Sequence, residues 1–420
     1  MTIPRASSLP RMVRLKQQFA GPILHDVAGA VRNTLERLAL TIKPGQSVAL
    51  AVGSRGIVNI DVVARACVDH MKRLGARPFV FPAMGSHGGG TAEGQLSVLE
   101  HYGVTEATMG CPIRATMDVV QVGEALGSPV WLDRYAAEAD WIGVINRVKP
   151  HTDFKGSLES GLFKMMTIGL GKHRGAIQGH RANIRHRYEN VITAVGREMV
   201  TKARIAFGLG IVENGYDETA RVEAFLPADI EAGDRALLQE AKAWMARLPF
   251  DSIDLLVVDE MGKDISGAGM DSNVIGRHGT FFEPQFGNPK ITFIVVCDLT
   301  PHTYGNAVGI GNANFTTRRL AGKIDWNATH INAFTACAPD AAKLPAVLPT
   351  DQDAVAVALS CLGYDRVEEA RVVRIKNTLR LAEVEVSEAF LPEVAKREDL
   401  RQVSEPSPLA FDATGSLLPF

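Results

Sequence analysis

The chain has few cysteines and no long apolar run. Its five cysteines are far apart and odd in number, and none is spaced Cys-x-x-Cys. This argues against a disulfide framework, an iron–sulfur cluster and a zinc ribbon. No stretch approaches the roughly 20 apolar residues of a membrane span. The start, Met1 to Gln18, has four basic residues but no apolar run long enough for a signal peptide. We therefore expect a cytoplasmic protein with reduced thiols and no membrane partner.

The chain also lacks an excess of charge of either sign. Its 45 basic and 47 acidic residues give a formal net charge of -2. A nucleic-acid partner would require a basic patch, and this balance gives no support to one. The length of 420 residues suits two or three domains, and a hydrophobic content of 46% is typical of a folded globular protein.

Short β-rich runs alternate with longer amphipathic runs in the first part of the chain. Strands are predicted over Ser47–Val52, Arg77–Pro82, Trp141–Ile145 and Ile205–Val212, and helices over Asn59–Leu74 and Thr91–Tyr102. Gly75 ends the first helix as a C′ glycine does, and Thr91 is the expected N-cap of the second. Strand–helix alternation of this kind predicts an α/β fold, with a mostly parallel sheet and helices on both faces.

A domain boundary is expected where a long helix, predicted over Asp229–Leu248, leads into Pro249. We assign residues 1–248 to a larger N-terminal domain and residues 249–394 to a smaller C-terminal α/β domain. The elements predicted in the smaller domain are strands over Asp254–Asp259, Ile291–Cys297 and Arg371–Ile375, and a helix over Asp351–Leu362. We expect the tail, residues 395–420, to be irregular surface or to return to the first domain, and the active site to lie in the cleft between the domains.

Polar side chains follow three of the predicted strands. Arg55 comes after the first strand, His87 after the second and His151 after the third. The carboxyl ends of parallel strands meet at one edge of a sheet, where ligands bind. These loops should therefore converge on one site. The glycines around His87 free backbone N–H groups for a ligand, although such a turn alone is as readily a tight strand–helix connection.

The segment from residue 146 to residue 180 contains three groups with distinct chemistry. His151 can transfer protons near neutral pH, Lys164 can act as a covalent anchor, and His180 can ligate a metal. Each has a simpler interpretation. Alone, His151 is more often a surface histidine, and His180 lies in a polar run that suits a solvated helix start. Lys164 follows Leu-Phe and precedes Met-Met, so it is either snorkelling or functional.

The ordered set of these residues is more specific than any member of it. An arginine after the first strand is followed by Gly-Ser-His, a Pro-His, a lysine, and a histidine sixteen residues past that lysine. This set resembles the nickel-dependent lactate racemase family over most of the first domain. The resemblance implies a nickel-pincer nucleotide tethered to Lys164 through a thioamide, with His180 as the nickel ligand. It also implies His87 and His151 as paired acid/base groups and Arg55 as the anchor of the substrate carboxylate.

The implied cofactor is a pyridinium-3,5-bisthiocarboxylic acid mononucleotide that carries nickel. We expect Ser54, Gly88 and Gly89 to contribute to its binding, and cofactor-synthesis proteins to be transient partners. The family's lactate racemases carry a glutamine and a lysine in the second domain that the corresponding stretch, residues 269–277, lacks. Arg277 is expected to supply the positive charge there, and His302 to line the pocket. A 2-hydroxy acid other than lactate is therefore the expected substrate.

The chemistry explains why these groups are needed. Inverting a 2-hydroxy acid requires the hydrogen at C2 to leave as a hydride while the hydroxyl loses its proton. The planar 2-keto acid can then take the hydride back on its other face. No side chain accepts a hydride, so a cofactor must. One histidine on either side, His87 and His151, would handle the proton. The predicted protein is an isomerase, a racemase or epimerase.

Two other classes of function stay open at this point. One is a zinc-dependent hydrolase or lyase that uses His87, His151 and His180 around the metal. The other is a non-catalytic protein that binds hydroxy or sugar acids, with Arg55 as the anchor. The sequence also leaves the oligomeric state open, a homo-oligomer included.

Overall fold

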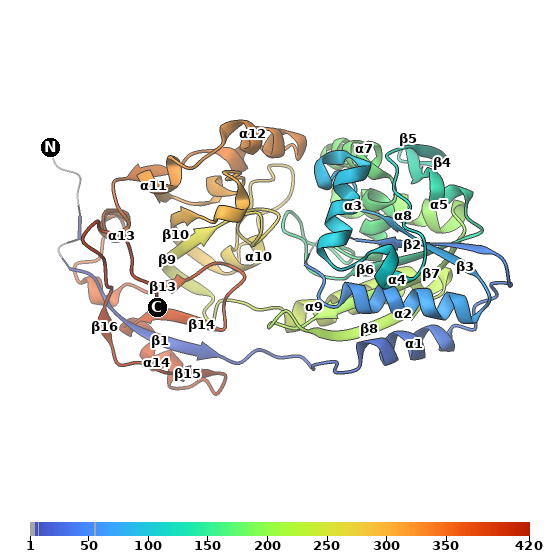
Figure 1. Ribbon diagram of the computed structural model, residues 1–420. Helices are drawn as coiled ribbons and strands as arrows, with labels where there is room; N and C mark the ends of the chain where they lie inside the picture. Colours follow the sequence, from blue (N-terminus) through green and yellow to red (C-terminus); the bar gives the residue numbers. More distant parts are fainter. Residues whose placement is uncertain (1–4, 7, 54–55) are drawn as a thin grey trace. The chain divides into compact units, whose positions relative to one another are not determined.

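The computed structural model describes residues 5–6, 8–53 and 56–420, which form two compact units (Figure 1). The N-terminal unit is Ala20–Met245. The C-terminal unit joins Met1–Phe19 to Ala246–Phe420. Among the described residues, no helix has the length and apolar content needed to cross a lipid bilayer.

The N-terminal unit is built around a five-stranded sheet with the strand order β3-β2-β6-β7-β8. Its strands are β2 (Ser47–Val52), β3 (Arg77–Pro82), β6 (Trp141–Arg147), β7 (Ile205–Glu213) and β8 (Thr219–Phe225). The first four are parallel, and β8 joins the edge as an antiparallel strand. The prediction of a mostly parallel sheet is confirmed, and β2 and β3 have the predicted bounds.

Helices cover both faces of this sheet, as predicted. They are α1 (Val27–Arg37), α2 (Ile60–Arg73), α3 (Ala92–His101), α4 (Glu106–Met109), α5 (Arg134–Glu138), α6 (Leu162–Lys164), α7 (Lys172–His186), α8 (Tyr188–Lys202) and α9 (Ile230–Trp244). Successive residues of β7 point to opposite faces. Phe207 and Leu209 share a core with residues of α1 and α2. On the other face, a Cβ at Gly208 would lie 3.0 Å from Leu162 Cδ1, so the missing side chain lets α6 approach the sheet closely.

The N-terminal unit also contains a separate antiparallel hairpin, formed by β4 (Val119–Ala125) and β5 (Ser128–Asp133). Neither the hairpin nor the helices α7 and α8 were among the predicted elements. The sequence of α7 is rich in basic residues and glycine and has no continuous apolar stripe. Its glycines contact neighbouring elements closely, since a Cβ at Gly179 would lie 2.6 Å from Ile168 Cδ1.

The C-terminal unit contains a sheet of nine strands among the described residues, in the order β12-β11-β10-β9-β13-β14-β1-β15, with β16 also paired to β1. Its strands are β1 (Arg11–Gln17), β9 (Ser252–Met261), β10 (Lys290–Leu299), β11 (Phe315–Thr317), β12 (Ala346–Leu348), β13 (Val372–Ile375), β14 (Glu383–Ser387), β15 (Leu400–Gln402) and β16 (Ser407–Pro408). Its helices are α10 (Ser272–Ile275), α11 (Arg318–Ala321), α12 (Trp326–Thr335), α13 (Asp351–Cys361) and α14 (Leu391–Val394). The strands from β12 to β13 are parallel.

The two ends of the chain differ from the expected domain assignment. Strand β1 pairs with β14, so the described residues before Ala20 lie in the C-terminal unit. The tail was expected to be irregular or to return to the first domain, but β15 and β16 both pair with β1 and keep it in the C-terminal unit. These pairings join segments almost 400 residues apart, which local sequence patterns do not encode.

Candidate active site

In the N-terminal unit, β2 and β3 end at the same level of the sheet, and the neighbouring β6 continues for two more residues. In the parallel register, Val52 at the end of β2 lies opposite Pro82 of β3 and Ile145 of β6. A Cβ at Gly53, the next residue of the chain, would lie 3.0 Å from Asn146 Oδ1 and 3.1 Å from Met165 Cε. The segments that follow the strands therefore leave the sheet close together. Ser54 and Arg55, which come next, lie outside the described residues.

His151, Lys164 and His180 form a cluster at this edge. The Nε2 atom of His151 is 2.7 Å from Nζ of Lys164. The ring of Tyr188 connects the two histidines, with its centroid 5.5 Å from that of His151 and 6.5 Å from that of His180. The loop after β6, the short helix α6, and α7 thus each contribute one of the three predicted groups.

The cluster favours neutral imidazoles. Burial lowers the pKa of His151 well below its ordinary value, and the charges of Lys164 and Lys149 act in the same direction. Burial, together with Lys164, lowers the pKa of His180 to about 4. The Nδ1 atom of His151 accepts a hydrogen bond from the backbone N–H of Asp153 at 3.0 Å. Both ring nitrogens of His151 are therefore in contact with neighbouring groups, Nδ1 with the Asp153 backbone and Nε2 with Lys164.

A buried carboxylate fixes the loop that carries His151. Glu159, whose side chain is fully buried, accepts hydrogen bonds from the backbone N–H of His151 at 2.7 Å and of Gly156 at 3.0 Å. Lys242 of α9 neutralises it, with Nζ 2.6 Å from a carboxylate oxygen. The His151 ring packs on Phe154, with the centroids 4.6 Å apart. Contacts with the backbone of His151 and with the face of its ring therefore hold the imidazole in place.

The two residues before Lys164, Leu162 and Phe163, hold it in place. The buried carboxylate of Asp234 on α9 accepts from the backbone N–H of Leu162 at 3.1 Å and of Phe163 at 2.9 Å, at the start of α6. A Cβ at Gly196 of α8 would lie 2.2 Å from Phe163 Cδ1, so the aromatic ring packs directly on the helix backbone. After Lys164 the chain continues as one π-helical turn, Met165–Gly169. Such turns are rare and are frequent at functional sites.

His87 lies on the glycine-rich loop after β3. Gly85, Gly88, Gly89 and Gly90 all have φ between 60° and 68°, a conformation that favours glycine. A Cβ at Gly85 would lie 3.0 Å from Ile168 Cγ2, and one at Gly90 would lie 3.4 Å from His173 Nδ1. The loop therefore packs against the π-helical turn that follows Lys164 and against the start of α7.

Comparison with known proteins finds a similarity of overall structure but none of sequence. No protein-family model and no curated protein sequence matches the chain. Among solved structures, the chain is similar to the lactate racemase apoprotein from Thermoanaerobacterium thermosaccharolyticum, with a TM-score of 0.47 and 11% sequence identity. The alignment covers 86% of this chain and 82% of that chain. A similarity at this level assigns no function.

Two further predicted residues, Arg277 and His302, belong to the C-terminal unit. The guanidinium of Arg277 donates to the backbone carbonyls of Ile291 and Thr292 and to Asn314 Oδ1. His302 is exposed in a single 3-10 turn, Pro301–Thr303. Their predicted contact with substrate stays a prediction.

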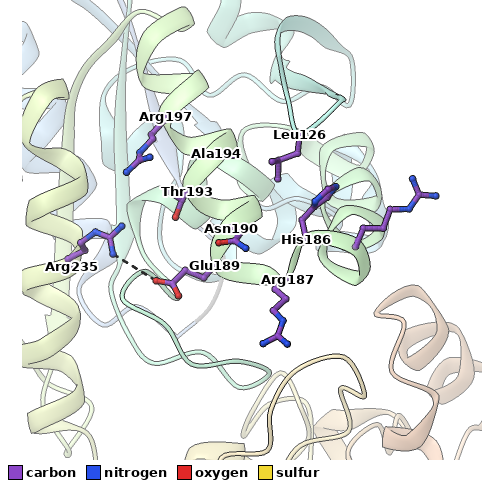
Figure 2. A pocket seen from close by; sticks show the side chains of 10 residues that line it. Leu126, His186, Arg187, Glu189, Asn190, Thr193, Ala194, Arg197 and Arg235 are labelled. Atoms are coloured by element: carbon purple, nitrogen blue, oxygen red, sulfur yellow. Dashed lines mark ion pairs between the residues drawn. The ribbon is translucent and has the colours of Figure 1, made fainter.

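A hollow of about 650 Å³ lies beside α8 but contains none of the predicted site residues (Figure 2). It is lined by Leu126, Arg185, His186, Arg187, Glu189, Asn190, Thr193, Ala194, Arg197 and Arg235. Figure 2 shows Arg235 directed at Glu189, and Arg187 pointing away from both. Arg197 and Arg235 also bind Glu231. Arg197 and Arg235 are thus already paired with an acid of the protein, so the hollow is not assigned as a ligand site.

Sequence reasoning missed the acids that hold the cluster. Asp234 had a detectable signal, because it lies on the apolar face of the predicted helix, between the buried Ile230 and Leu237. An acid in such a stripe is seldom left without partners. Glu159 had no comparable signal, since its partners are backbone groups and a lysine 83 residues away.

Proposed function

We propose that this protein is an isomerase that inverts C2 of a 2-hydroxy acid, using a nickel-pincer nucleotide tethered to Lys164. The observation that carries the proposal is the 2.7 Å contact between Lys164 Nζ and His151 Nε2, with His180 in the same cluster. An amine and two imidazoles thus come together. The resemblance to the lactate racemase family implies that they are the cofactor tether, a proton-transfer group and the metal ligand.

The residues present fit such a cofactor. Nδ1 of His180 is buried and has no hydrogen-bond partner among the described residues, so a ring nitrogen is left for another ligand. A pincer nucleotide brings its own carbon and sulfur donors, and it needs only one imidazole from the protein. Lys164 would hold its pyridinium group and His180 its metal. When bound, the cofactor supplies the hydride acceptor that the side chains lack.

During turnover, His87 and His151 would move the proton of the substrate hydroxyl, one for each enantiomer. A neutral imidazole can take this proton at pH 7, and the lowered pKa keeps His151 neutral. Arg55 would orient the substrate carboxylate with its two-pronged guanidinium. Arg277 and His302 would contact the rest of the acid.

The zinc alternative receives no support from the geometry. It requires His87, His151 and His180 to surround one metal ion. In the part of the chain that the structure describes, no three His, Cys, Asp or Glu side chains are grouped so that they could hold a metal. The non-catalytic binder needs only an arginine anchor and does not explain the contact between Lys164 and His151.

Covalent loading tests the proposal directly. The chain is coexpressed with cofactor-synthesis proteins, and intact-mass analysis should show an adduct with stoichiometric nickel. Lys164→Ala should lose the adduct, because the variant lacks the amine that contacts His151 Nε2. Lys202→Ala, at the exposed end of α8, is the matched control and should load normally. An adduct of unchanged mass on Lys164→Ala would show that the tether is elsewhere, and stoichiometric zinc would favour the metallohydrolase.

A further inference from the structure

Lys172, the first residue of α7, is a fully buried lysine that the proposed mechanism does not use. Its side chain has no solvent exposure, and its φ is 55°, a conformation that is strained for a non-glycine residue. Burial lowers the pKa of Lys172 to about 8, although nearby Asp133 opposes the shift. A buried cation on a strained backbone must be held by specific partners.

Those partners come from three separate elements. Nζ of Lys172 donates to the carbonyl oxygen of Pro82 at the end of β3, at 2.7 Å, and to Oε1 of Gln95 on α3, at 2.5 Å. A carboxylate oxygen of Asp133, at the end of β5, lies 3.7 Å away. Lys172 therefore joins α7 to the start and to the end of the connection that carries His87.

Gln95 passes this constraint to the His87 loop. Its side-chain amide has one acceptor and two donors. Because a protonated lysine can only donate, Oε1 must face Lys172 and the Nε2 group must face the opposite way. Nε2 donates to the carbonyl oxygens of Gly85 at 3.0 Å and of His87 at 3.3 Å. The lysine thus fixes the orientation of the amide, and the amide binds the loop on both sides of Ser86.

The composition of the loop makes such a contact important. Four of its residues are glycines with positive φ, which provide no side chains for packing and gain much freedom when released. The loop also lies close to α3, since a Cβ at Gly88 would lie 2.5 Å from the carbonyl carbon of Gly94. Gln95 binds the carbonyl group of His87 itself, so a change in the amide acts directly on this residue.

We infer that Lys172 and Gln95 are positioning residues that hold the His87 loop in the geometry needed for proton transfer. The role in proton transfer rests on the proposed function, whereas the link between Lys172, Gln95 and the loop does not. The two parts are separately measurable.

The test uses Gln95→Met, Gln95→Glu and Lys172→Met. Gln95→Glu keeps an acceptor for Lys172 but loses both donors to the loop, so it should behave like Gln95→Met and remains informative if Lys172→Met does not fold. In the cofactor-free protein, amide hydrogen exchange over residues 84–90 should become about tenfold faster, with β7 unchanged. Thr34→Val, which removes a buried hydroxyl bonded to the backbone N–H of Ala224, is the control and should leave the loop unchanged.

In the loaded enzyme, kcat of the Gln95 variants should fall about ten- to a hundredfold with little change in KM, because a misplaced acid/base group affects the chemical step. Loop exchange that stays at the wild-type rate overturns the inference, as does faster exchange spread evenly through the N-terminal unit. Selective loop exchange with an unchanged kcat overturns the role in proton transfer. If the loaded wild type isomerises no acid, the proposed function fails, and the exchange data alone decide whether the two residues hold the loop.

Discussion

His151 is the residue on which the proposed chemistry places the greatest demand. Its ring contacts Lys164 through Nε2 and the Asp153 backbone through Nδ1, and only 7% of its surface is exposed. Burial keeps the ring neutral at pH 7, and a substrate proton can reach it when one of these two contacts is exchanged. Inversion needs an acceptor on one side of the substrate and a donor on the other, so His87 and His151 should both act in each direction.

Replacing either histidine should therefore impair both directions equally. We expect His87→Ala and His151→Ala each to lower kcat by roughly 100- to 10,000-fold, the usual contribution of general acid–base catalysis. Initial rates are measured from each enantiomer with loaded enzyme, and metal content is checked for every variant. His25→Ala, at an exposed position, is the control. Near-wild-type rates for either variant in either direction would exclude that histidine from the mechanism.

The sequence indicates the reactive groups better than it indicates their supports. Lys164 stands out because a charged residue interrupts an apolar run. His151 alone favours a surface histidine, but the structure buries it, because Glu159 binds its backbone and Phe154 covers its ring. Supports of this kind depend on contacts between distant segments, such as Lys172 with Gln95, 77 residues apart. No local pattern encodes them.

At the scale of elements, the start of α6 contacts the two helices α8 and α9 and the strand β7. Gly208 of β7 and Gly196 of α8 leave room for Leu162 and Phe163, and Asp234 of α9 caps the helix. β2 and β3 were predictable because they are short, buried and bounded by turn residues. Helix α7 was not predictable as a core element, because it packs through glycines and a buried lysine and not through an apolar stripe.

From the burial of Asp234 at the start of α6, we predict that the stability of the protein depends on pH. Burial raises the pKa of Asp234 to about 6, against about 3.9 in an unfolded chain. Between these values the folded state holds a proton that the unfolded state has lost. The contribution of Asp234 to the free energy of unfolding therefore falls as pH rises from about 4 to about 6 and is constant above that. Over this range the loss should be about 3 kcal/mol, at about 1.4 kcal/mol per pKa unit.

Asp234→Asn isolates this effect, because all other groups titrate alike in the variant and the wild type. Denaturant unfolding of both proteins is followed from pH 4 to pH 8, using the transition of the N-terminal unit. The variant should gain stability relative to the wild type as pH rises from 4 to 6, and the difference should then stay level. A difference that is the same at every pH would mean that Asp234 does not titrate in this range.

At the scale of the whole molecule, the chain builds two α/β units, and the proposed cofactor residues described here lie in the N-terminal one. The α/β class could be predicted from strand–helix alternation. That β1 belongs to the C-terminal unit could not be predicted, because β1 pairs with β14 and β15, which lie more than 360 residues further along the chain. Residues 269–277 lack the glutamine and lysine expected of a lactate racemase, so the substrate proposed here is a 2-hydroxy acid other than lactate.

Isotope transfer tests the central claim most directly. A panel of chiral 2-hydroxy acids, from short aliphatic to sugar acids, is prepared with deuterium at C2 and incubated in ordinary water with nickel-loaded enzyme. The account predicts that at least one acid is inverted and that its product keeps the deuterium, because the hydrogen leaves and returns as a hydride without meeting solvent. Inversion with loss of deuterium to water, or no inversion of any acid by fully loaded enzyme, would contradict it.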